Sequence, residues 1–300
     1  MTGTLWAIVG ATGTGKTALS LDLAERLAES ARPAEIVNAD AMQFYRGMDI
    51  GTAKIAPADR RGIPHHLFDV LTPREEATVA WYQPTARSVI EQILSRGHDA
   101  ILIGGSGLYV SSVIFDFRFP PRDEAVRAQL ESELSDLGVD RLFQRLQAVD
   151  PAAAAVVDPR NGRRVVRALE LAALGASAHG SLPAAPEYWH PATRTVGVHV
   201  ERSQLVTRLD RRVEQMWADG LLEEVRALLP DGIEHGKTAS HAIGYAQALA
   251  QLAGTLTADE AIAQTQALTR RYARRQVSWF TRYPHIEWLS EPDPEQILAG

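Results

Sequence analysis

The chain of 300 residues contains no cysteine. This absence excludes disulfides, thiolate nucleophiles, and zinc or iron–sulfur sites with cysteine ligands. No apolar run approaches the length of a membrane-spanning helix, and the segment Met1 to Val9 is too short and too weakly charged for a signal peptide. We therefore expect a cytoplasmic protein with no membrane partner.

The sequence also lacks an excess of positive charge. It has 31 Lys and Arg against 37 Asp and Glu, a net charge of −6, which taken alone speaks against a nucleic-acid partner. Hydrophobic residues make up 45% and charged residues 23%, the usual proportions of a soluble globular protein, which excludes fibrous and disordered classes. The length fits one large domain or two modest ones.

Short apolar strands and amphipathic helices alternate over the first hundred residues. The pattern predicts strands at 5–9, 35–39 and 100–103, and helices at 16–30 and 79–96, the second interrupted by Pro84. Such an alternation is typical of an α/β fold, in which helices flank a parallel β-sheet.

The strand signal disappears near residue 117. Helices are predicted at 124–137, 141–147 and 161–174, and a loop rich in Pro, Ala and Gly follows at 177–191. A strand at 195–200, further helices to residue 280 and a short strand at 286–289 then resume the earlier pattern. We therefore predict an α/β core made of residues 1–116 and 193–300, with an all-helical insertion domain at 117–192.

A phosphate-binding motif, G-x-x-x-x-G-K-[ST], lies between the first predicted strand and the first helix. In such a P-loop, backbone N–H groups and the helix N-terminus bind phosphate, the lysine neutralises terminal phosphates, and the hydroxyl suits Mg²⁺. Thr17 is thus the candidate metal ligand. The candidate diphosphate-binding residues are Gly10, Ala11, Thr12, Gly13, Thr14, Gly15, Lys16 and Thr17.

A second chemical group is expected at the same edge of the sheet. The strand 100–103 ends in glycines, without the aspartate with which nucleotide hydrolases usually hold Mg²⁺. Asp40 instead follows the second strand, so it should lie beside the P-loop. Its carboxylate could bind Mg²⁺ or accept a proton from a nucleophile, and the structural alternative is a turn or helix-capping aspartate.

Seven motifs together resemble the tRNA isopentenyltransferase family, over about residues 5–289. They are the P-loop, DAMQFYRGMDIGTAK at 40–54, PHHL at 64–67, GGSGLY at 104–109, RRVVRALE at 163–170, AIGY at 242–245 and RYARRQVSWF at 271–280. The resemblance implies an enzyme that transfers a dimethylallyl group from dimethylallyl diphosphate, not ATP, to N6 of the adenosine 3′-adjacent to the anticodon, adenosine-37. It further implies tRNAs that read codons beginning with U, release of diphosphate, and Mg²⁺ as cofactor.

The resemblance also implies roles for individual residues. Asp40 matches the general base, Lys16 and the loop amides would stabilise the leaving diphosphate, and Ser106 stands where a threonine hydroxyl is usual near the reacting atoms. The adenosine would be flipped out of the anticodon stack to reach the site. The implied tRNA contacts are Asp40, Ala41, Met42, Gln43, Ser106, Arg127, Arg163, Arg164, Val165, Val166 and Arg167.

The chain departs from the family pattern at three places. Ala41 replaces a usual serine, Met216 stands where many members have an arginine near the diphosphate, and Ala246 stands where Lys or Arg is common. The missing charge at Met216 could come from one of three nearby residues, Arg208, Arg211 or Arg212.

Two other clusters have structural alternatives. The arginines between 160 and 167 have helical spacing, which suits one tRNA-facing side but is equally typical of a solvated helix face. The basic and aromatic stretch 270–282 could stack on RNA, although its aromatic residues fit a helix packed into the core. His65 and His66 are adjacent on a strand, point to opposite faces, and are interpreted as structural.

Two other activities remain open at this point. One is a P-loop kinase that uses ATP on a small molecule, and the other is an adenylate isopentenyltransferase that prenylates free AMP. The helical insertion and its arginines favour tRNA over a free nucleotide. We expect the protein to act as a monomer.

Overall fold

The structure, a computed structural model, describes residues 3–117, 119–120, 122–176, 186–283 and 285–299. It divides into two units, which are treated separately below. The first unit is formed by Met1–Phe117 with Ala185–Gly300, and the second by Arg118–Ala184.

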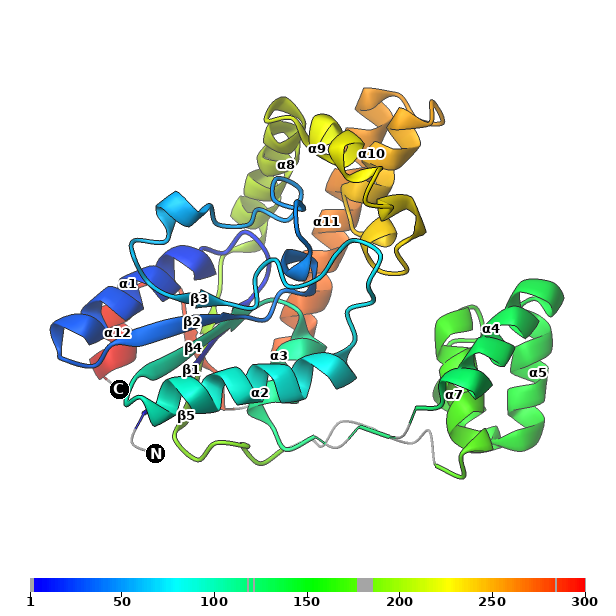
Figure 1. Ribbon diagram of the computed structural model, residues 1–300, viewed down its shortest axis with the longest axis horizontal. Helices are drawn as coiled ribbons and strands as arrows, with labels where there is room; N and C mark the ends of the chain where they lie inside the picture. The colour runs from blue at the N-terminus through cyan, green and yellow to red at the C-terminus, as the bar shows by residue number, and fades with distance from the viewer. Residues whose placement is uncertain (1–2, 118, 121, 177–185, 284, 300) are drawn as a thin grey trace. The chain divides into compact units, whose positions relative to one another are not determined.

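A six-stranded parallel sheet forms the centre of the first unit (Figure 1), with the strand order β3-β2-β4-β1-β5-β6. Its register pairs Val9 of β1 with Gly104 of β4 on one side and with Gly197 of β5 on the other. The strands are β1 (Leu5–Gly10), β2 (Ala34–Asn38), β3 (His65–His66), β4 (Asp99–Gly104), β5 (Thr193–Val198) and β6 (Glu287–Leu289). The predicted α/β core with a parallel sheet is confirmed.

Helices cover both faces of this sheet. On one face α1 (Lys16–Glu29) packs its buried leucines against Ile8, Ile36 and Ile101, and α12 (Pro294–Ala299) lies beside it. The strands also contact α2 (Val79–Ser95), α3 (Gly107–Ile114) and α11 (Ala258–Phe280). The unit also contains α8 (Arg202–Ala218), α9 (Leu221–Leu228), α10 (Tyr245–Leu252) and four 3₁₀ helices at Ala41–Phe44, Pro57–Asp59, Ile233–His235 and Ala239–His241.

The helix α2 differs from its sequence prediction at Pro84. The sequence predicted an interruption there, but the helix runs unbroken through the proline. Pro84 lies in the second turn of the helix, where its ring removes one N–H from the hydrogen-bond ladder and its backbone stays helical. Thr78 caps the helix by accepting the N–H of Trp81 at 3.2 Å.

The second unit is built from helices alone within its described residues. They are α4 (Glu124–Leu137), α5 (Val139–Val149), α6 (Pro151–Val156) and α7 (Gly162–Ala173). Leu130, Leu142, Leu146 and Val165 belong to a hydrophobic core of its own. The all-helical insertion is thus confirmed in class, while the part of the predicted loop at 177–185 lies outside the described residues.

The chain leaves and re-enters the first unit through paired backbone segments. Phe115 forms an antiparallel bridge with Tyr188, and their rings stack with centroids 5.3 Å apart. The N–H of Asp116 donates to the carbonyl of Glu187 at 3.1 Å. The two chain segments that lead to and from the insertion therefore lie side by side in the first unit.

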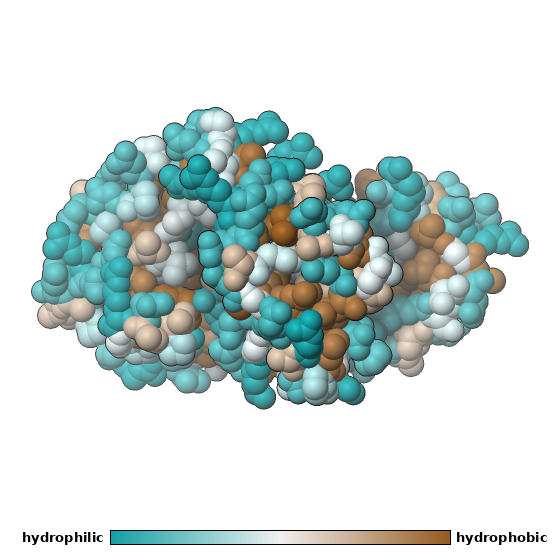
Figure 2. Space-filling view, turned by 90° about the horizontal axis from the view of Figure 1, so that it is seen from above, coloured by the Kyte–Doolittle hydropathy of each residue, from teal (hydrophilic) through white to brown (hydrophobic). Residues whose placement is uncertain are grey.

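Hydrophilic side chains cover most of the face shown in Figure 2, and apolar residues appear in patches between them. Among the residues that the structure describes, no helix combines the length and apolar character needed to cross a membrane.

Candidate active site

The P-loop connects the end of β1 to the start of α1, as the motif predicts. Gly10, Gly13 and Gly15 have φ angles of 142°, 82° and 95°, which side-chain-bearing residues rarely adopt. A Cβ on Gly10 would lie 2.7 Å from the carbonyl oxygen of Val198, so the neighbouring strand also requires glycine there. Thr12, Gly13, Gly15, Lys16 and Thr17 line one pocket at the N-terminus of α1, the kind of position that binds phosphate.

Lys16 is held inside this loop. Its Nζ donates to the carbonyl oxygen of Ala11 at 2.6 Å. Burial lowers its pKa to about 8, an effect that the nearby carboxylate of Asp40 opposes and the guanidinium of Arg212 reinforces. A bound anion would favour the charged ammonium form, so the site is prepared for negative charge.

Arg212 of α8 supplies the second cation of the pocket. Its Nη2 donates to Thr12 Oγ1 at 2.8 Å, and its Nε is buried without a hydrogen-bond partner among the described residues. Buried donors are normally paired, so an unpaired guanidinium N–H beside a phosphate loop indicates an anionic ligand. Burial lowers the pKa of Arg212, and the neighbouring Asp40 carboxylate opposes that shift.

Asp40 follows β2 and caps the 3₁₀ helix that begins at Ala41. Its Oδ1 accepts the N–H of Met42 at 3.0 Å, while its own N–H donates to Asn38 Oδ1 at 2.9 Å. Burial raises the pKa of the carboxyl group, and the hydrogen bond from Met42 and the charges of Lys16 and Arg212 oppose this rise. The structural interpretation as a cap is therefore correct, and it leaves the second carboxylate oxygen available for chemistry.

Two pockets meet at this carboxylate. The first, the donor pocket, contains Gly13, Gly15, Lys16 and Thr17 together with apolar side chains such as Phe68. The second, the acceptor pocket, is lined by residues that include Met42, His241, Tyr272 and Arg275. The residues common to both are Thr12, Asp40, Thr52 and Arg212. The arrangement can hold a diphosphate on one side and a second substrate on the other, with one carboxylate between them.

Comparison with known proteins assigns the family. A model described as IPP transferase matches residues 43–283. The chain belongs to the IPP transferase family. This confirms the resemblance drawn from the seven sequence motifs.

Individual relatives of this family are similar over nearly their whole length. The tRNA dimethylallyltransferase of Clavibacter sepedonicus is 58% identical over 287 residues, covering 96% of this chain and 93% of the relative. That of Leifsonia xyli subsp. xyli is 61% identical over 260 residues, covering 86% and 98%. The full-length tRNA isopentenylpyrophosphate transferase of Bacillus halodurans has a similar structure, with a TM-score of 0.69, 39% identity, and coverage of 99% and 93%.

A more distant solved structure also matches this member of the IPP transferase family. It is a eukaryotic dimethylallyltransferase acting on tRNA, with a TM-score of 0.71, 27% identity, and coverage of 93% of this chain and 70% of that one.

The structure distinguishes the three arginines considered near Met216. Arg208 and Arg211 are exposed, whereas Arg212 is half-buried and lines both pockets. Met216 is 7% exposed and also lines the acceptor pocket, and Arg212, one helical turn before it, is the one of these three arginines that lines both pockets. The sequence alone left the choice among the three arginines open. Helical spacing nevertheless favours Arg212, because it lies next to the buried face of α8 that includes Leu205 and Leu209.

Ser106 lies just before α3 and is connected to the acceptor pocket through Tyr272. Its Oγ lies 3.3 Å from the hydroxyl oxygen of Tyr272, which lines the acceptor pocket. Ser106 itself is not among the described residues that line either pocket. Burial, helped by the Asp40 charge, raises the pKa of Tyr272 to about 12, so Tyr272 remains a hydrogen-bond donor near neutral pH.

The segment after Asp40 contributes unequally to the site. Met42 lines the acceptor pocket and Gln43 the donor pocket, where Gln43 Nε2 donates to the carbonyl oxygen of Thr52 at 3.0 Å. Ala41 is 6% exposed and lines neither pocket within the described chain.

The other predicted tRNA-contacting residues belong to the helical unit. Val165 and Val166 are buried in its core, whereas Arg163 and Arg164 are exposed on α7. Arg127 and Arg167 both donate to the fully buried carboxylate of Glu170, at 3.2 Å and 2.8 Å. Arg160, predicted to share the helical face, precedes the helix, which begins at Gly162.

The two adjacent histidines have structural hydrogen bonds. His65 Nδ1 lies 2.7 Å from the carbonyl oxygen of Ile63, and His66 Nε2 lies 2.7 Å from Glu35 Oε2. In the described part of the chain, no group of three or more His, Cys, Asp or Glu side chains could hold a metal ion.

Proposed function

We propose that the protein transfers a dimethylallyl group from dimethylallyl diphosphate to N6 of adenosine-37, 3′-adjacent to the anticodon, in tRNAs that read codons beginning with U. The products are N6-(dimethylallyl)adenosine and diphosphate. The observation that carries this proposal is the position of Asp40 where the donor and acceptor pockets meet, in a chain of the IPP transferase family.

The donor pocket suits the leaving group. When the allylic C–O bond breaks, its electron pair goes to the diphosphate and positive character develops on the prenyl carbon. Lys16, Arg212 and the P-loop amides would stabilise the negative charge that collects on the diphosphate oxygens. Apolar side chains in the same pocket, Ile36, Ile55 and Phe68 among them, suit the prenyl chain.

The donor set for Mg²⁺ is small but suitable. Thr17 is exposed at the start of α1 and lines the donor pocket, so its hydroxyl is accessible to an ion in that pocket. Mg²⁺ keeps several waters and is usually bound by few protein groups together with substrate phosphate oxygens, so this hydroxyl fits an ion held mainly by the diphosphate and leaves Asp40 available as a base. When bound, Mg²⁺ would offset the negative charge of the diphosphate.

Asp40 would accept the proton that the adenine amine loses. The nitrogen lone pair forms the new C–N bond, and a carboxylate within hydrogen-bond reach takes the released proton. The rise in pKa that burial causes makes Asp40 a better proton acceptor than an exposed aspartate. Tyr272, with Ser106 beside it, would orient the base from the acceptor side.

The helical unit would contact the tRNA through its arginines. Arg163 and Arg164 are exposed on α7, while Arg127 and Arg167 are oriented by Glu170. Guanidinium groups on a helix suit the phosphate backbone of an RNA stem-loop. Val165 and Val166 would support this helix from the core of the unit.

The test is a transfer assay with labelled dimethylallyl diphosphate and one acceptor at a time. We expect label in unmodified tRNA, at adenosine-37, and none in AMP. Transfer to AMP alone would indicate an adenylate isopentenyltransferase, and ATP-dependent phosphorylation of a small molecule without prenyl transfer would indicate a kinase. Size measurement of the active protein tests our proposal that it works as a monomer.

A further inference from the structure

A short loop, residues 48–54, forms part of the lining of both pockets. Gly51 and Thr52 line the acceptor pocket, and Thr52 also lines the donor pocket. The loop has no helix or strand of its own to fix it. Turn hydrogen bonds, such as Ala53 N–H to the carbonyl oxygen of Ile50 at 3.0 Å, shape the loop, and side chains that bind its backbone attach it to the rest of the fold.

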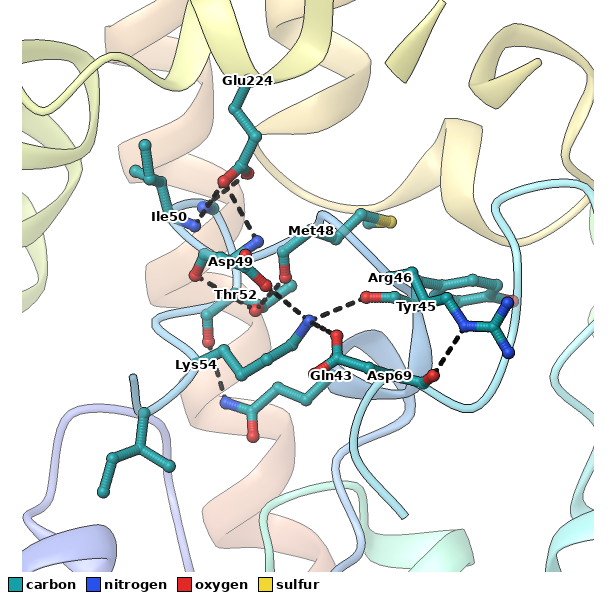
Figure 3. Close-up of polar contacts among 12 residues, drawn as sticks. Gln43, Tyr45, Arg46, Met48, Asp49, Ile50, Thr52, Lys54, Asp69 and Glu224 are labelled. Carbon is teal, nitrogen blue, oxygen red and sulfur yellow. Dashed lines mark hydrogen bonds and ion pairs between the residues drawn. The ribbon is translucent and has the colours of Figure 1, made fainter. Parts of the chain in front are cut away.

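Glu224 of α9 binds the acceptor end of this loop (Figure 3). Its Oε2 accepts the N–H groups of Asp49 at 3.1 Å and Ile50 at 2.8 Å, and its Oε1 accepts that of Gly51 at 3.4 Å. Three successive backbone amides thus converge on one carboxylate from a helix about 170 residues later in the chain. Hydrogen bonds to an ionised acceptor are stronger than those between neutral groups.

Tyr245 fixes Glu224 in turn. Its hydroxyl donates to Glu224 Oε1 at 2.5 Å, and the tyrosine is fully buried at the start of α10. The ring lies so close to Gly51 that a Cβ there would collide with it. Glu224 and Tyr245 therefore form one clamp, with a carboxylate on the loop amides and a ring against the glycine.

The far end of the loop has an independent anchor. Lys54 is 3% exposed, and its Nζ contacts the carbonyl oxygen of Tyr45 at 2.7 Å and the carboxylates of Asp49 and Asp69, each at 2.6 Å (Figure 3). This anchor keeps the loop attached to the fold when the clamp is removed. Loss of Glu224 should then displace residues 49–52 without unfolding the unit.

The clamp is connected to the reacting carboxylate through Thr52. The carbonyl oxygen of Thr52 accepts a hydrogen bond from Gln43 Nε2 at 3.0 Å, and Gln43 belongs to the 3₁₀ helix that Asp40 caps. Movement of the loop would therefore shift both the wall beside the acceptor base and the helix that orients Asp40.

We propose that Glu224 is a positioning residue for prenyl transfer, which it serves by holding the 48–54 loop against the acceptor base. This inference rests on the proposed function. The P-loop, Lys16 and Arg212 do not contact the clamp residues in any described hydrogen bond, so binding of the diphosphate should not depend on it. Misplacement of reacting groups by about 1 Å can cost about 100-fold in rate.

The experiment compares steady-state prenyl transfer to tRNA by the wild type and three variants. We expect Glu224→Ala to lower kcat by about 10- to 100-fold, with KM for tRNA and the affinity for pyrophosphate within about twofold of wild type. Glu224→Gln should restore most of the rate, because one amide oxygen still accepts from Asp49 and Ile50. Tyr245→Phe keeps the ring and should lower kcat less than Glu224→Ala does.

Glu223→Ala is the matched control, since this neighbour is exposed and contacts only Arg226, at 3.5 Å, among its described partners. Unchanged kcat in Glu224→Ala, with an active wild type, would overturn the inference. So would a parallel loss of kcat, pyrophosphate affinity and thermal stability that Gln does not rescue, since that pattern indicates a purely structural role. An inactive wild type would instead refute the proposed function.

Discussion

The two carboxylate oxygens of Asp40 have different surroundings. Oδ1 caps a 3₁₀ helix by accepting the N–H of Met42, and Asn38 fixes the backbone before it. The other oxygen has no hydrogen bond in the described part of the chain and lies where the two pockets meet. The cap therefore holds the other oxygen at the meeting of the pockets, which agrees with the proposed role of Asp40 as a base.

Asp40→Asn tests the chemical duty alone. The amide keeps the shape of the side chain and an oxygen for the Met42 N–H, but it cannot take a proton from the adenine amine. We expect kcat for prenyl transfer to fall by about 10²- to 10⁴-fold, the usual contribution of a positioned base. Pyrophosphate and tRNA binding, measured by calorimetry and filter binding, should stay close to wild type. Near-normal turnover would remove Asp40 from the role of base.

Lys16 should make diphosphate binding dependent on pH. Burial lowers its pKa to about 8 in the free protein, whereas a bound diphosphate would favour the ammonium form and raise that pKa. Affinity is then constant below the free pKa and falls as the pH rises through it, by up to about tenfold per pH unit.

The comparison with Lys16→Arg isolates this effect. A guanidinium stays charged throughout the range, so the variant should lack the loss of affinity above pH 8 that Lys16 causes. Calorimetric titration with pyrophosphate from pH 6.5 to 9.5 measures both proteins, and the titration of pyrophosphate itself is common to them. Parallel curves would mean that Lys16 does not titrate in this range.

The residues predictable from sequence are those fixed by local geometry. The P-loop and the edge position of Asp40 follow from adjacent elements, so motif and strand order predict both. Glu224 shows the limit: it meets residues 49–51 only because α9 folds over a loop distant in sequence. No spacing within the chain encodes that meeting.

At the scale of elements, α7 shows how a single helix serves both core and surface. Val165 and Val166 lie in the hydrophobic core of the helical unit, while Arg163 and Arg164 lie on the exposed side. The buried carboxylate of Glu170 binds Arg127 and Arg167. An ion pair on such a buried acid positions its arginines, and a solvated face alone would need no such acid.

Arg164→Ala tests the exposed side of this helix. We expect weaker tRNA binding and a smaller dependence of the binding constant on salt, with the slope of log K against log[salt] reduced by about 0.7 to 0.9 per lost phosphate contact. Fluorescence anisotropy with labelled tRNA at several salt concentrations measures it, and Arg145→Ala, on α5, is a control from the same unit. An unchanged slope would identify the arginines of α7 as a solvated face.

Elements were predictable where their pattern was strong. The helix at 124–137 has the predicted bounds because Asp123 caps it and Gly138 ends it, both local signals. The helix α3 was not anticipated, since eight mostly apolar residues after a strand show no clear period. The strand β3 has only two residues, His65 and His66, which the sequence interpretation also placed on a strand, but its pairing with β2 comes from the fold and not from a local pattern.

At the scale of the whole molecule, the two chain segments that lead to and from the helical unit are paired within the first unit. Phe115 and Tyr188 form this pair, and the helical unit has its own hydrophobic core. The net charge of −6 is a sum over the whole chain, so it conceals the exposed arginines of α7. Composition alone therefore pointed away from a nucleic acid that the family uses as substrate.

Replacing residues 118–185 by a short Gly-Ser linker tests the division of labour. The paired segments already bring the two ends of the core together, so a short linker closes them with little entropic cost. We expect pyrophosphate affinity within about twofold of wild type and tRNA affinity at least about tenfold weaker, because phosphate contacts dominate RNA affinity. Undiminished tRNA binding would place the main tRNA-binding surface on the core.

The meeting of the two pockets has a consequence for how the prenyl donor is protected. The four residues shared by the donor and acceptor pockets place the two cavities next to each other, so an empty acceptor pocket would leave solvent beside the allylic carbon of a bound donor. The flipped adenine would therefore exclude water from the acceptor pocket as well as act as the nucleophile. The bound tRNA would thus protect the donor from water, and we expect the enzyme incubated with dimethylallyl diphosphate but without tRNA to release diphosphate slowly by hydrolysis.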